Sequence, residues 1–416
     1  MSRRCLPTVS RRALLGASVL SSLGLLLYPR EGSAAAPVAA SPGGPVLLYL
    51  FLRGAADGLN MVVPHADDDY YRLRSTIAIP RPGQDQGAVD LDGRFGLHPR
   101  LAPLKAAYDA GELALIHAVG SPQLTRSHFE AQDYMETAGV PDRAQAQGWL
   151  ARYLRSRPAQ GPDLVRAIAL ASRTPLSLRG YPNAIVTPSL KDFRLSGNDA
   201  LQPLLAQGFE RLYQANSLDL PERAGAQALS ASGVLRQALR TKSAARYPGG
   251  ARDFADLARL IKADVGVETA CIDVGGWDTH SGQGRSEGGE LPRQLDRLGR
   301  CLASFRADLG PHFERVVVVV MTEFGRTARQ NGTGGTDHGH GSVMLVLGGK
   351  VKGGRVLGDF PGLADDKLHE GRDLAVTTDF RDVLAEVCER HLGATSPARI
   401  FPGYQLDPSR RLGLFA

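Results

Sequence analysis

The residues with the clearest metal-binding chemistry lie in the segment Thr336-Asp337-His338-Gly339-His340-Gly341. Two imidazoles and one carboxylate fall within four residues of this segment, and both kinds of side chain bind Zn²⁺ or Mn²⁺. The intervening glycines permit tight backbone turns that can aim neighbouring side chains at one point. The alternative is a solvated glycine-rich turn, because short motifs of this kind also occur by chance. The motif alone leaves both interpretations open.

Other polar residues follow the ends of predicted strands elsewhere in the chain. Asp57 follows the apolar run 46–52. The run 113–119 is followed by Arg126, Ser127 and His128, and the run 268–274 is followed by Asp278 and His280. The metal-binding motif follows the run 316–321 after a polar loop, 322–335. The carboxyl ends of parallel strands meet at one edge of a sheet, where open α/β sheets bind their ligands. If the strands are parallel, these groups converge on one site.

The elements that position these groups alternate between strands and helices. The run 316–321 contains five consecutive valines, which is typical of a buried parallel strand. Further strands are predicted at 343–347 and, as shorter ones, at 167–170 and 184–186, with helices at 101–110, 291–309 and 379–392. This alternation predicts an α/β fold with a mostly parallel central sheet. The glycine-rich stretch 348–354 is predicted to be a hairpin turn.

The stretch from about residue 142 to 264 differs from the rest of the chain in its pattern of predicted helices and strands. Helix-like periodicity occurs at 201–215, 225–241 and 253–261, with few strands between these segments. We expect a mainly helical insertion beside the sheet. Such an insertion could form a lid over a site, or it could be a packing module without a role in chemistry.

The first 36 residues are predicted to be a twin-arginine export signal. Arg11 and Arg12 precede an uncharged run, 13–28, and small residues follow at 32–36, which is the order of such a signal. The alternative is a membrane anchor, but the run is shorter than the roughly 20 apolar residues that a spanning helix needs. We therefore expect a periplasmic or secreted protein, exported in its folded state and without a membrane span after cleavage.

Charge and cysteine content exclude two classes of partner and site. Residues 1–36 contain five arginines and one glutamate, so their removal lowers the net charge from +6 to about +2. The remaining chain has no basic run with interleaved aromatics, which argues against a nucleic-acid partner. Cys271, Cys301 and Cys388 allow at most one internal disulfide and contain no Cys-x-x-Cys pair, so a thiolate zinc site is not expected.

Six motifs together resemble a known family. They are Arg-Gly-Ala-Ala-Asp-Gly at 53–58, Arg-Ser-His-Phe-Glu-Ala-Gln-Asp at 126–133, Gly-Gly-Trp-Asp-Thr-His at 275–280, Thr-Glu-Phe-Gly-Arg-Thr at 322–327, Thr-Asp-His-Gly-His-Gly at 336–341 and Thr-Thr-Asp-Phe-Arg-Asp at 377–382. The set resembles an exported bacterial family of unknown function, numbered fifteen hundred and one among such domains. More distantly, it resembles the alkaline phosphatase and sulfatase superfamily. The resemblance implies an alkaline-phosphatase-like α/β/α sandwich over residues 45–416.

The superfamily resemblance implies two divalent metals, zinc or manganese, beside a hydroxyl or modified-cysteine nucleophile. One metal would bind Asp57, Asp337 and His338, and the other would bind Asp278 and His280, with Asp273 and His340 as further candidates. The nucleophile would be Ser127, with Thr125 as the alternative hydroxyl. Arg126 or Arg53 would grip the substrate oxygens, and His128 would be a base or would orient a ligand.

Two departures from the superfamily pattern affect the assignment of the superfamily's site residues to positions in this chain. The Asp-x-x-x-His spacing common at the second metal is absent, and Asp337 lies some fifteen residues beyond the strand 316–321. Glu323 lies directly after that strand instead, and it could be a ligand or base, or could form a structural ion pair with Arg326.

Two functions follow from these observations. The first is an exported metal-dependent hydrolase of phosphate or sulfate esters with a metal-activated serine. Its substrate would be a small anionic ester or a glycan. The second is a non-catalytic protein of the same fold that binds or assembles with another exported protein.

Overall fold

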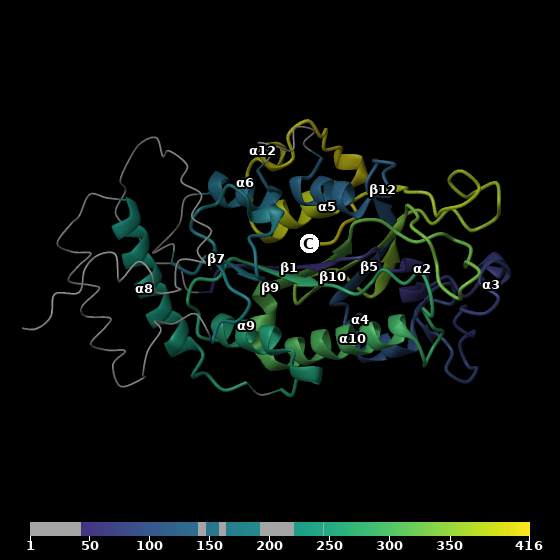
Figure 1. Cartoon of the computed structure of the whole chain (residues 1–416), viewed down its shortest axis with the longest axis horizontal. Coiled ribbons are helices and arrows are strands. Elements are labelled where there is room, and N and C mark those ends of the chain that lie inside the picture. The colour runs from purple at the N-terminus through teal and green to yellow at the C-terminus, as the bar shows by residue number, and fades with distance from the viewer. Residues whose placement is uncertain (1–42, 140–146, 158–163, 192–219, 244) are drawn as a thin grey trace, which may run out of the picture.

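The computed structural model describes residues 43–139, 147–157, 164–191, 220–243 and 245–416. The predicted export signal and the predicted helix 201–215 lie outside these residues. A nine-stranded sheet crosses the middle of the molecule, with helices on both faces (Figure 1). A second, three-stranded sheet is formed by β2 (Val62–Val63), β4 (Gly96–Leu97) and β3 (Val89–Asp90). The predicted α/β class is confirmed.

The order of the strands across the large sheet differs from their order along the chain. They are β11 (Arg355–Leu357), β5 (Leu113–Gly120), β10 (Ser342–Gly348), β9 (Val316–Thr322), β1 (Val46–Leu52), β8 (Thr269–Val274), β6 (Ala167–Leu170) and β7 (Ile185–Val186), with β12 (Thr378–Asp379) also pairing with β5. The long strands match their predicted ranges to within a residue at each end, because each is a continuous apolar run that is buried on both faces.

One strand of the large sheet runs against the others. β10 is antiparallel to both β9 and β5, whereas β1 is parallel to β9 and β8. β5 therefore runs in the same direction as β1, β8 and β9. The carboxyl ends of these four strands meet at one edge, and the residues that precede β10 lie at that same edge. Because β10 is antiparallel to its neighbours, the motif 336–341, which precedes β10, lies at the same edge as the residues that follow the four parallel strands.

The helices form a layer on each side of the sheet (Figure 1). One layer contains α5 (His128–Thr137), α6 (Trp149–Ser156), α11 (Phe380–Glu386) and α12 (Pro397–Ile400), and the other contains α4 (Lys105–Asp109), α9 (Arg252–Lys262) and α10 (Glu290–Leu309). The remaining α-helices are α2 (Gly58–Met61), α3 (Asp68–Leu73) and α8 (Leu220–Ala238). No helix in the described ranges is long and apolar enough to cross a membrane.

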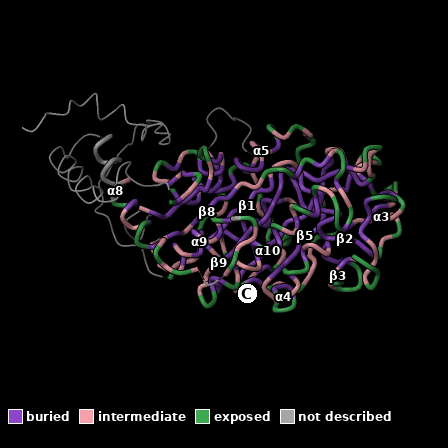
Figure 2. The backbone as a smooth tube through the Cα atoms, turned by 60° about the horizontal axis from the view of Figure 1, so that its bottom comes forward, coloured by how far each residue is buried: buried purple, intermediate pink, exposed green. Residues whose placement is uncertain are grey.

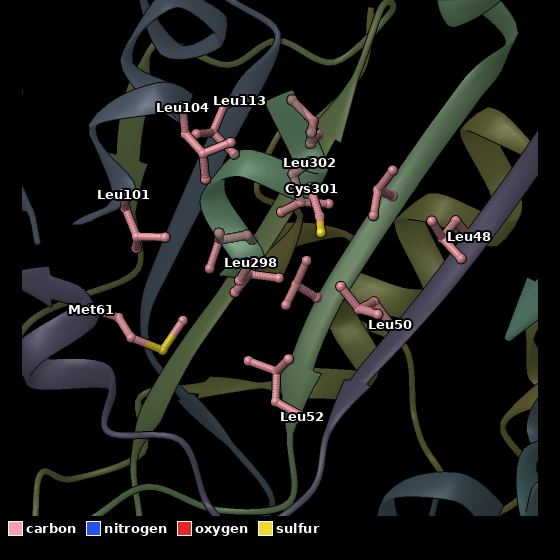
Figure 3. Packing of buried hydrophobic residues seen from close by; sticks show 14 of the residues in the cluster. Leu48, Leu50, Leu52, Met61, Leu101, Leu104, Leu113, Leu298, Cys301 and Leu302 are labelled. Carbon is pink, nitrogen blue, oxygen red and sulfur yellow. The ribbon is translucent and has the colours of Figure 1, made fainter. Parts of the chain in front are cut away.

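Two hydrophobic cores lie on opposite faces of the sheet. Alternate residues of β1 point to opposite sides, so Leu48 and Leu50 join the core beneath α10, while Tyr49 and Phe51 join the core beneath α6 and α11. Figure 3 shows the first core, in which Leu298, Cys301 and Leu302 of α10 pack toward β1. The strands form the buried centre of the chain (Figure 2). This rigid frame fixes the loops at the carboxyl edge.

The segment 142–264 contributes to the sheet as well as to the helices. Its strands β6 and β7 extend the parallel sheet beyond β8, so this part of the predicted insertion is continuous with the main fold. Helices α8 and α9 follow in the same segment.

Two smaller predictions have clear outcomes. The stretch 348–354 does not form a hairpin turn, because β10 and β11 lie on opposite sides of β5 and the chain must cross between them. Cys271, Cys301 and Cys388 are all buried and free, without a disulfide.

Candidate metal centre

Four side chains from three loops meet at the carboxyl edge of the sheet. His128 is the first residue of α5, Asp278 and His280 lie in the loop after β8, and His338 lies in the loop before β10. The ligand atoms of His128, Asp278 and His338 lie within 4.8 Å of one another. The Nε2 atom of His280 adds a further group, 2.9 Å from Nε2 of His338. We call these four residues the histidine–aspartate centre.

The tautomer of His338 follows from its partner. Its Nδ1 atom lies 2.9 Å from the main-chain carbonyl oxygen of Arg126. A carbonyl can only accept, so Nδ1 carries the proton and donates it. The Nε2 atom of His338 therefore presents a lone pair toward the centre. Burial also lowers the pKa of His338, which favours the neutral ring.

His280 has the same arrangement with a different acceptor. Its Nδ1 atom donates to Oδ1 of Asp337 over 2.9 Å, and this hydrogen bond lowers the pKa of the Asp337 carboxyl, which keeps it ionised. When the ring is neutral, Nε2 holds a lone pair. That atom lies 3.0 Å from Oδ1 of Asp278 as well as close to His338.

His128 completes the pattern. Its Nδ1 atom donates to Oε1 of Glu323 over 2.8 Å, and this hydrogen bond raises the pKa of the imidazole. Its Nε2 atom is buried and has no hydrogen-bond partner. That atom lies 3.4 Å from Oδ2 of Asp278. The ring is held on its other side by Phe324, which stacks on it with centroids 5.1 Å apart.

These contacts place acceptors against acceptors. With neutral rings, the facing atoms of His280, His338 and Asp278 all carry lone pairs, yet they lie 2.9 to 3.2 Å apart. Such a cluster is unfavourable unless a cation, either a proton or a metal ion, lies among the groups. A tetrahedral zinc ion with bonds of about 2.0 Å separates neighbouring ligand atoms by roughly 3.3 Å. The observed separations are close to this value, and they also match a proton shared between two of the groups.

Asp278 is oriented by a buried arginine. The NH1 group of Arg326 donates to Oδ1 of Asp278 over 2.8 Å, and its Nε donates to the hydroxyl of Thr336. Partial burial opposes ionisation of Asp278, but this hydrogen bond and charge outweigh it and lower the pKa. The predicted ion pair between Glu323 and Arg326 is not formed, because Arg326 pairs with Asp278.

Glu323 is a fully buried carboxylate beneath the centre. Besides His128, it accepts hydrogen bonds from the main-chain N–H of Gly54, the side chain of Gln132 and the hydroxyl of Thr322. Burial raises its pKa, but the hydrogen bonds from His128, Gln132 and the backbone reverse the shift and lower it. Glu323 therefore orients His128 as an ionised acceptor, in the way that carboxylates support metal-binding histidines.

Two glycines allow the loops to approach closely. A Cβ atom on Gly54 would lie 2.6 Å from the main-chain nitrogen of Asp278, and φ at Gly54 is +120°. A Cβ atom on Gly339 would lie 2.4 Å from the main chain of Arg326. Larger residues at either position would push the loops of the centre apart. This packing explains the glycines in two of the six motifs.

The structure places Asp57 in a different environment from the one expected. Its side chain is 1% exposed, and its two oxygens accept from NH1 and NH2 of Arg74 over 2.6 and 3.0 Å. Gln283 donates to it as well, over 2.6 Å. With its oxygens bound in this way, Asp57 acts as a structural ion-pair partner, and we do not include it among the ligands. Asp273 is similarly engaged, because it pairs with Arg53 at 2.9 Å.

Two residues of the opening motif lie beside the centre without forming it. Asp337 stands behind His280 and also accepts from Asn331, so it supports a ligand. His340 stacks on His369 with centroids 4.8 Å apart, and burial lowers its pKa to about 4. Of the motif, His338 is therefore the residue that enters the centre.

The predicted nucleophile and anion-binding residue flank the centre. Ser127 is exposed at the N-terminus of α5, and its hydroxyl does not cap the helix. The alternative hydroxyl, Thr125, donates to Glu130 over 2.6 Å. The Arg126 side chain points to Glu370 and Asp373, at 2.8 Å from each. Arg126 therefore contributes to the centre through its main-chain carbonyl.

Residues 118–402 match the family described as "Protein of unknown function (DUF1501)". The chain belongs to this family. The matched range begins within β5 and includes His128, Asp278, His280 and His338, so this DUF1501 protein carries its whole centre inside the family region. No curated protein matches it.

Several solved structures are similar to the DUF1501 protein at low sequence identity. The C-terminal periplasmic domain of EcEptC from Escherichia coli, in complex with Zn, has 9% identity and a TM-score of 0.36, covering 76% of this chain and 77% of its own. A 2-O GAG sulfatase has 12% identity and a TM-score of 0.38, covering 88% and 74%. The phosphonate monoester hydrolase of Agrobacterium radiobacter has 10% identity and a TM-score of 0.32, covering 87% and 78%.

Proposed function

We propose that this DUF1501 protein is a metal-dependent hydrolase of phosphate or sulfate esters that binds one divalent cation at the histidine–aspartate centre. One observation carries the proposal. Each of the three imidazoles donates its Nδ1 proton to a fixed oxygen and turns Nε2 toward Asp278. Metal-binding histidines show this arrangement, in which the second nitrogen is hydrogen-bonded to a carboxylate or carbonyl.

The donor set favours zinc over manganese. Imidazole nitrogens suit zinc, whereas manganese prefers oxygen ligands, and the centre offers three imidazoles and one carboxylate. A bound divalent cation would polarise the ester oxygen and stabilise negative charge as the bond breaks. The chain's own residues contribute geometry: Glu323, Asp337 and the Arg126 carbonyl fix the rings, and Arg326 fixes Asp278.

The structure supports one metal rather than the two that the superfamily resemblance implies. Among the described residues, one group of at least three potential ligands converges. The carboxylates expected at another metal have other partners, because Asp57 binds Arg74 and Asp273 binds Arg53. Moving Asp57 away from Arg74 would leave the buried guanidinium without its counter-charge.

Ser127 is the hydroxyl that we propose as nucleophile. It immediately precedes His128, so their Cα atoms are about 3.8 Å apart. Its position at the start of α5 also places it near the positive end of the helix, which favours an ionised oxygen and a bound anion. A matched pair of variants tests this role. Ser127→Ala should abolish turnover, whereas Thr125→Val should retain it, and turnover in Ser127→Ala would assign the attack to water.

The hydrolase is tested by assaying metal-reconstituted protein with phosphate and sulfate monoesters. Turnover that requires zinc or manganese and is lost in His338→Ala supports the proposal. Metal binding without turnover of any ester would favour the non-catalytic alternative, in which the fold serves as a binding partner. Absence of metal binding would remove the basis for both the site and the reaction.

We further propose that the protein acts outside the cytoplasm. The support is the paired Arg11 and Arg12 before the uncharged run 13–28. Replacing both arginines with lysine should retain the protein in the cytoplasm of its host. Export that is unaffected by this change would contradict the twin-arginine route.

A further inference from the structure

The segment that supplies His128 to the histidine–aspartate centre carries an unusual apolar feature. Among the side chains that the structure describes, the exposed large hydrophobic ones are Leu124, at 58% exposure, and Phe129, at 85%. Both lie within four residues of His128 in the sequence. Single exposed hydrophobic residues are ordinary on protein surfaces, but two of them flanking one candidate ligand call for an explanation.

The segment that bears these side chains is fixed to the centre. His128 is adjacent to Phe129 at the start of α5, and the main-chain carbonyl of Arg126 accepts from His338 over 2.9 Å. Thr125 donates to Glu130 over 2.6 Å, which ties the loop that bears Leu124 to the first turn of the helix. The segment that bears the two apolar side chains is therefore anchored to the centre by hydrogen bonds on both sides of Ser127.

An apolar residue also packs against the imidazoles of the centre. Phe324 packs with Ala55 and Ala131 in a small hydrophobic cluster. The Phe324 ring lies 5.1 Å from the ring centroids of both His128 and His338. The centre thus has a buried apolar residue packed against two of its imidazoles, and the segment that supplies His128 carries two exposed apolar side chains.

The charges around the centre argue against a highly anionic substrate body. The neighbouring arginines are each paired with a carboxylate: Arg53 with Glu136 and Asp273, Arg126 with Glu370 and Asp373, Arg326 with Asp278, and Arg372 with Asp373. Each pairing neutralises a charge that could otherwise attract additional phosphates or sulfates. The phosphate or sulfate group would then be the one anionic group of the substrate, and the bound cation would attract it.

We propose that Phe129 and Leu124 select esters whose alcohol portion is an apolar chain or ring, so that the substrate is an amphiphilic phosphate or sulfate monoester. This inference rests on the proposed hydrolase function. Contact with the apolar portion would bury Phe129 and Leu124 and remove apolar area of protein and substrate from water together. A hydrophilic sugar portion would leave both side chains in contact with water.

The test compares ethyl, hexyl and decyl phosphate, and the corresponding sulfates, each below its micelle concentration, with zinc-reconstituted full-length protein. The wild-type protein should show kcat/KM that rises with chain length. In Phe129→Ser and in the double variant with Leu124→Ser, the ratio of kcat/KM for the decyl ester over the ethyl ester should fall roughly 10- to 100-fold. Phe129→Leu, which keeps an apolar side chain, should retain most of the ratio.

Gln123→Ser is the matched control, because Gln123 is an exposed polar residue on the same loop. It should keep the wild-type ratio. Affinity for non-hydrolysable decyl and ethyl phosphonates, measured by calorimetry, should show the same loss in Phe129→Ser. Both serine variants change exposed positions, so a fall in the ratio with an unchanged melting temperature reports recognition and not folding.

The failures of the two proposals are distinguishable. If wild-type protein hydrolyses none of the esters, the hydrolase function fails. If it hydrolyses all chain lengths with equal kcat/KM, or if the ratio survives both serine substitutions, the apolar selection is wrong while the hydrolase stands. Vesicle binding that is lost in Phe129→Ser, without a change in the ratio, would overturn the proposal in favour of contact with a membrane surface.

Discussion

The Nδ1 atom of His128 lies 2.8 Å from Oε1 of Glu323, a carboxylate with no exposed surface. The two residues come from α5 and from the end of β9, far apart in the sequence. The pair leaves Nε2 of His128 free, buried and turned toward Asp278. A buried carboxylate that orients an imidazole in this way strengthens it as a metal ligand.

The first prediction concerns this pair. Glu323→Gln keeps the shape of the side chain but removes the charge that holds the Nδ1 proton of His128. We expect the affinity for zinc to fall roughly 10- to 100-fold, measured by competition with a chelator of known affinity. Glu314→Gln, a change in the helical turn before β9, is the control and should bind zinc as the wild type does. Wild-type affinity in Glu323→Gln would show that the pair does not support a ligand.

The second prediction separates a structural role of Asp57 from a ligand role. Asp57→Asn leaves Arg74 buried without its counter-charge, and breaking such a pair costs roughly 3 to 5 kcal/mol of the free energy of unfolding. Denaturant titration of metal-free protein should show this loss, and the folded variant should still bind one zinc ion. Unchanged stability together with loss of the metal would instead identify Asp57 as a ligand.

The third prediction is an acid sensitivity built into the core. Burial lowers the pKa of His98, His117 and His391 to about 4 each. These rings are neutral in the folded protein, while the unfolded chain takes up their protons below about pH 6.5. The unfolded state therefore binds more protons between pH 6.5 and 4, so the free energy of unfolding falls as the pH drops through this window.

A variant isolates one of these groups. His117→Gln removes one titrating side chain, so the slope of unfolding free energy against pH should decrease in this window by up to about 1.4 kcal/mol per pH unit. The comparison is made in chelator, to exclude effects of bound metal. Parallel pH profiles of wild type and variant would contradict a neutral, buried His117.

Much of the fold could be predicted from local sequence. The runs 46–52 and 316–321 are apolar, seven and six residues long, and rich in β-branched or large aliphatic residues, and this length and composition favour a buried strand. The runs 113–119 and 268–274 are predicted to be parallel to these two strands, which places the polar residues that follow them at one edge, and His128 and Asp278 meet there. Membership of the DUF1501 family, expected from the six motifs, is confirmed.

The partners of individual charges could not be predicted in the same way. Arg74 lies 17 residues from Asp57 in a separate loop, and no local pattern marks their ion pair. The direction of β10 could not be predicted either, because the hydrophobic periodicity of a strand is the same whether the strand is parallel or antiparallel to its neighbours. Yet that direction brings His338 to the site. The importance of Glu323 had one local signal, its place directly after a buried strand, but its partner depends on the packing of α5.

The central claim is that His128, Asp278, His280 and His338 hold one divalent metal ion. Calorimetric titration of chelator-stripped protein with zinc tests it most directly, with parallel titrations of His338→Ala and His280→Ala. We predict one zinc ion per chain in the wild type and a large loss of affinity in both variants, which should remain folded. No binding to the wild type, or binding that both variants retain at full affinity, would contradict the account.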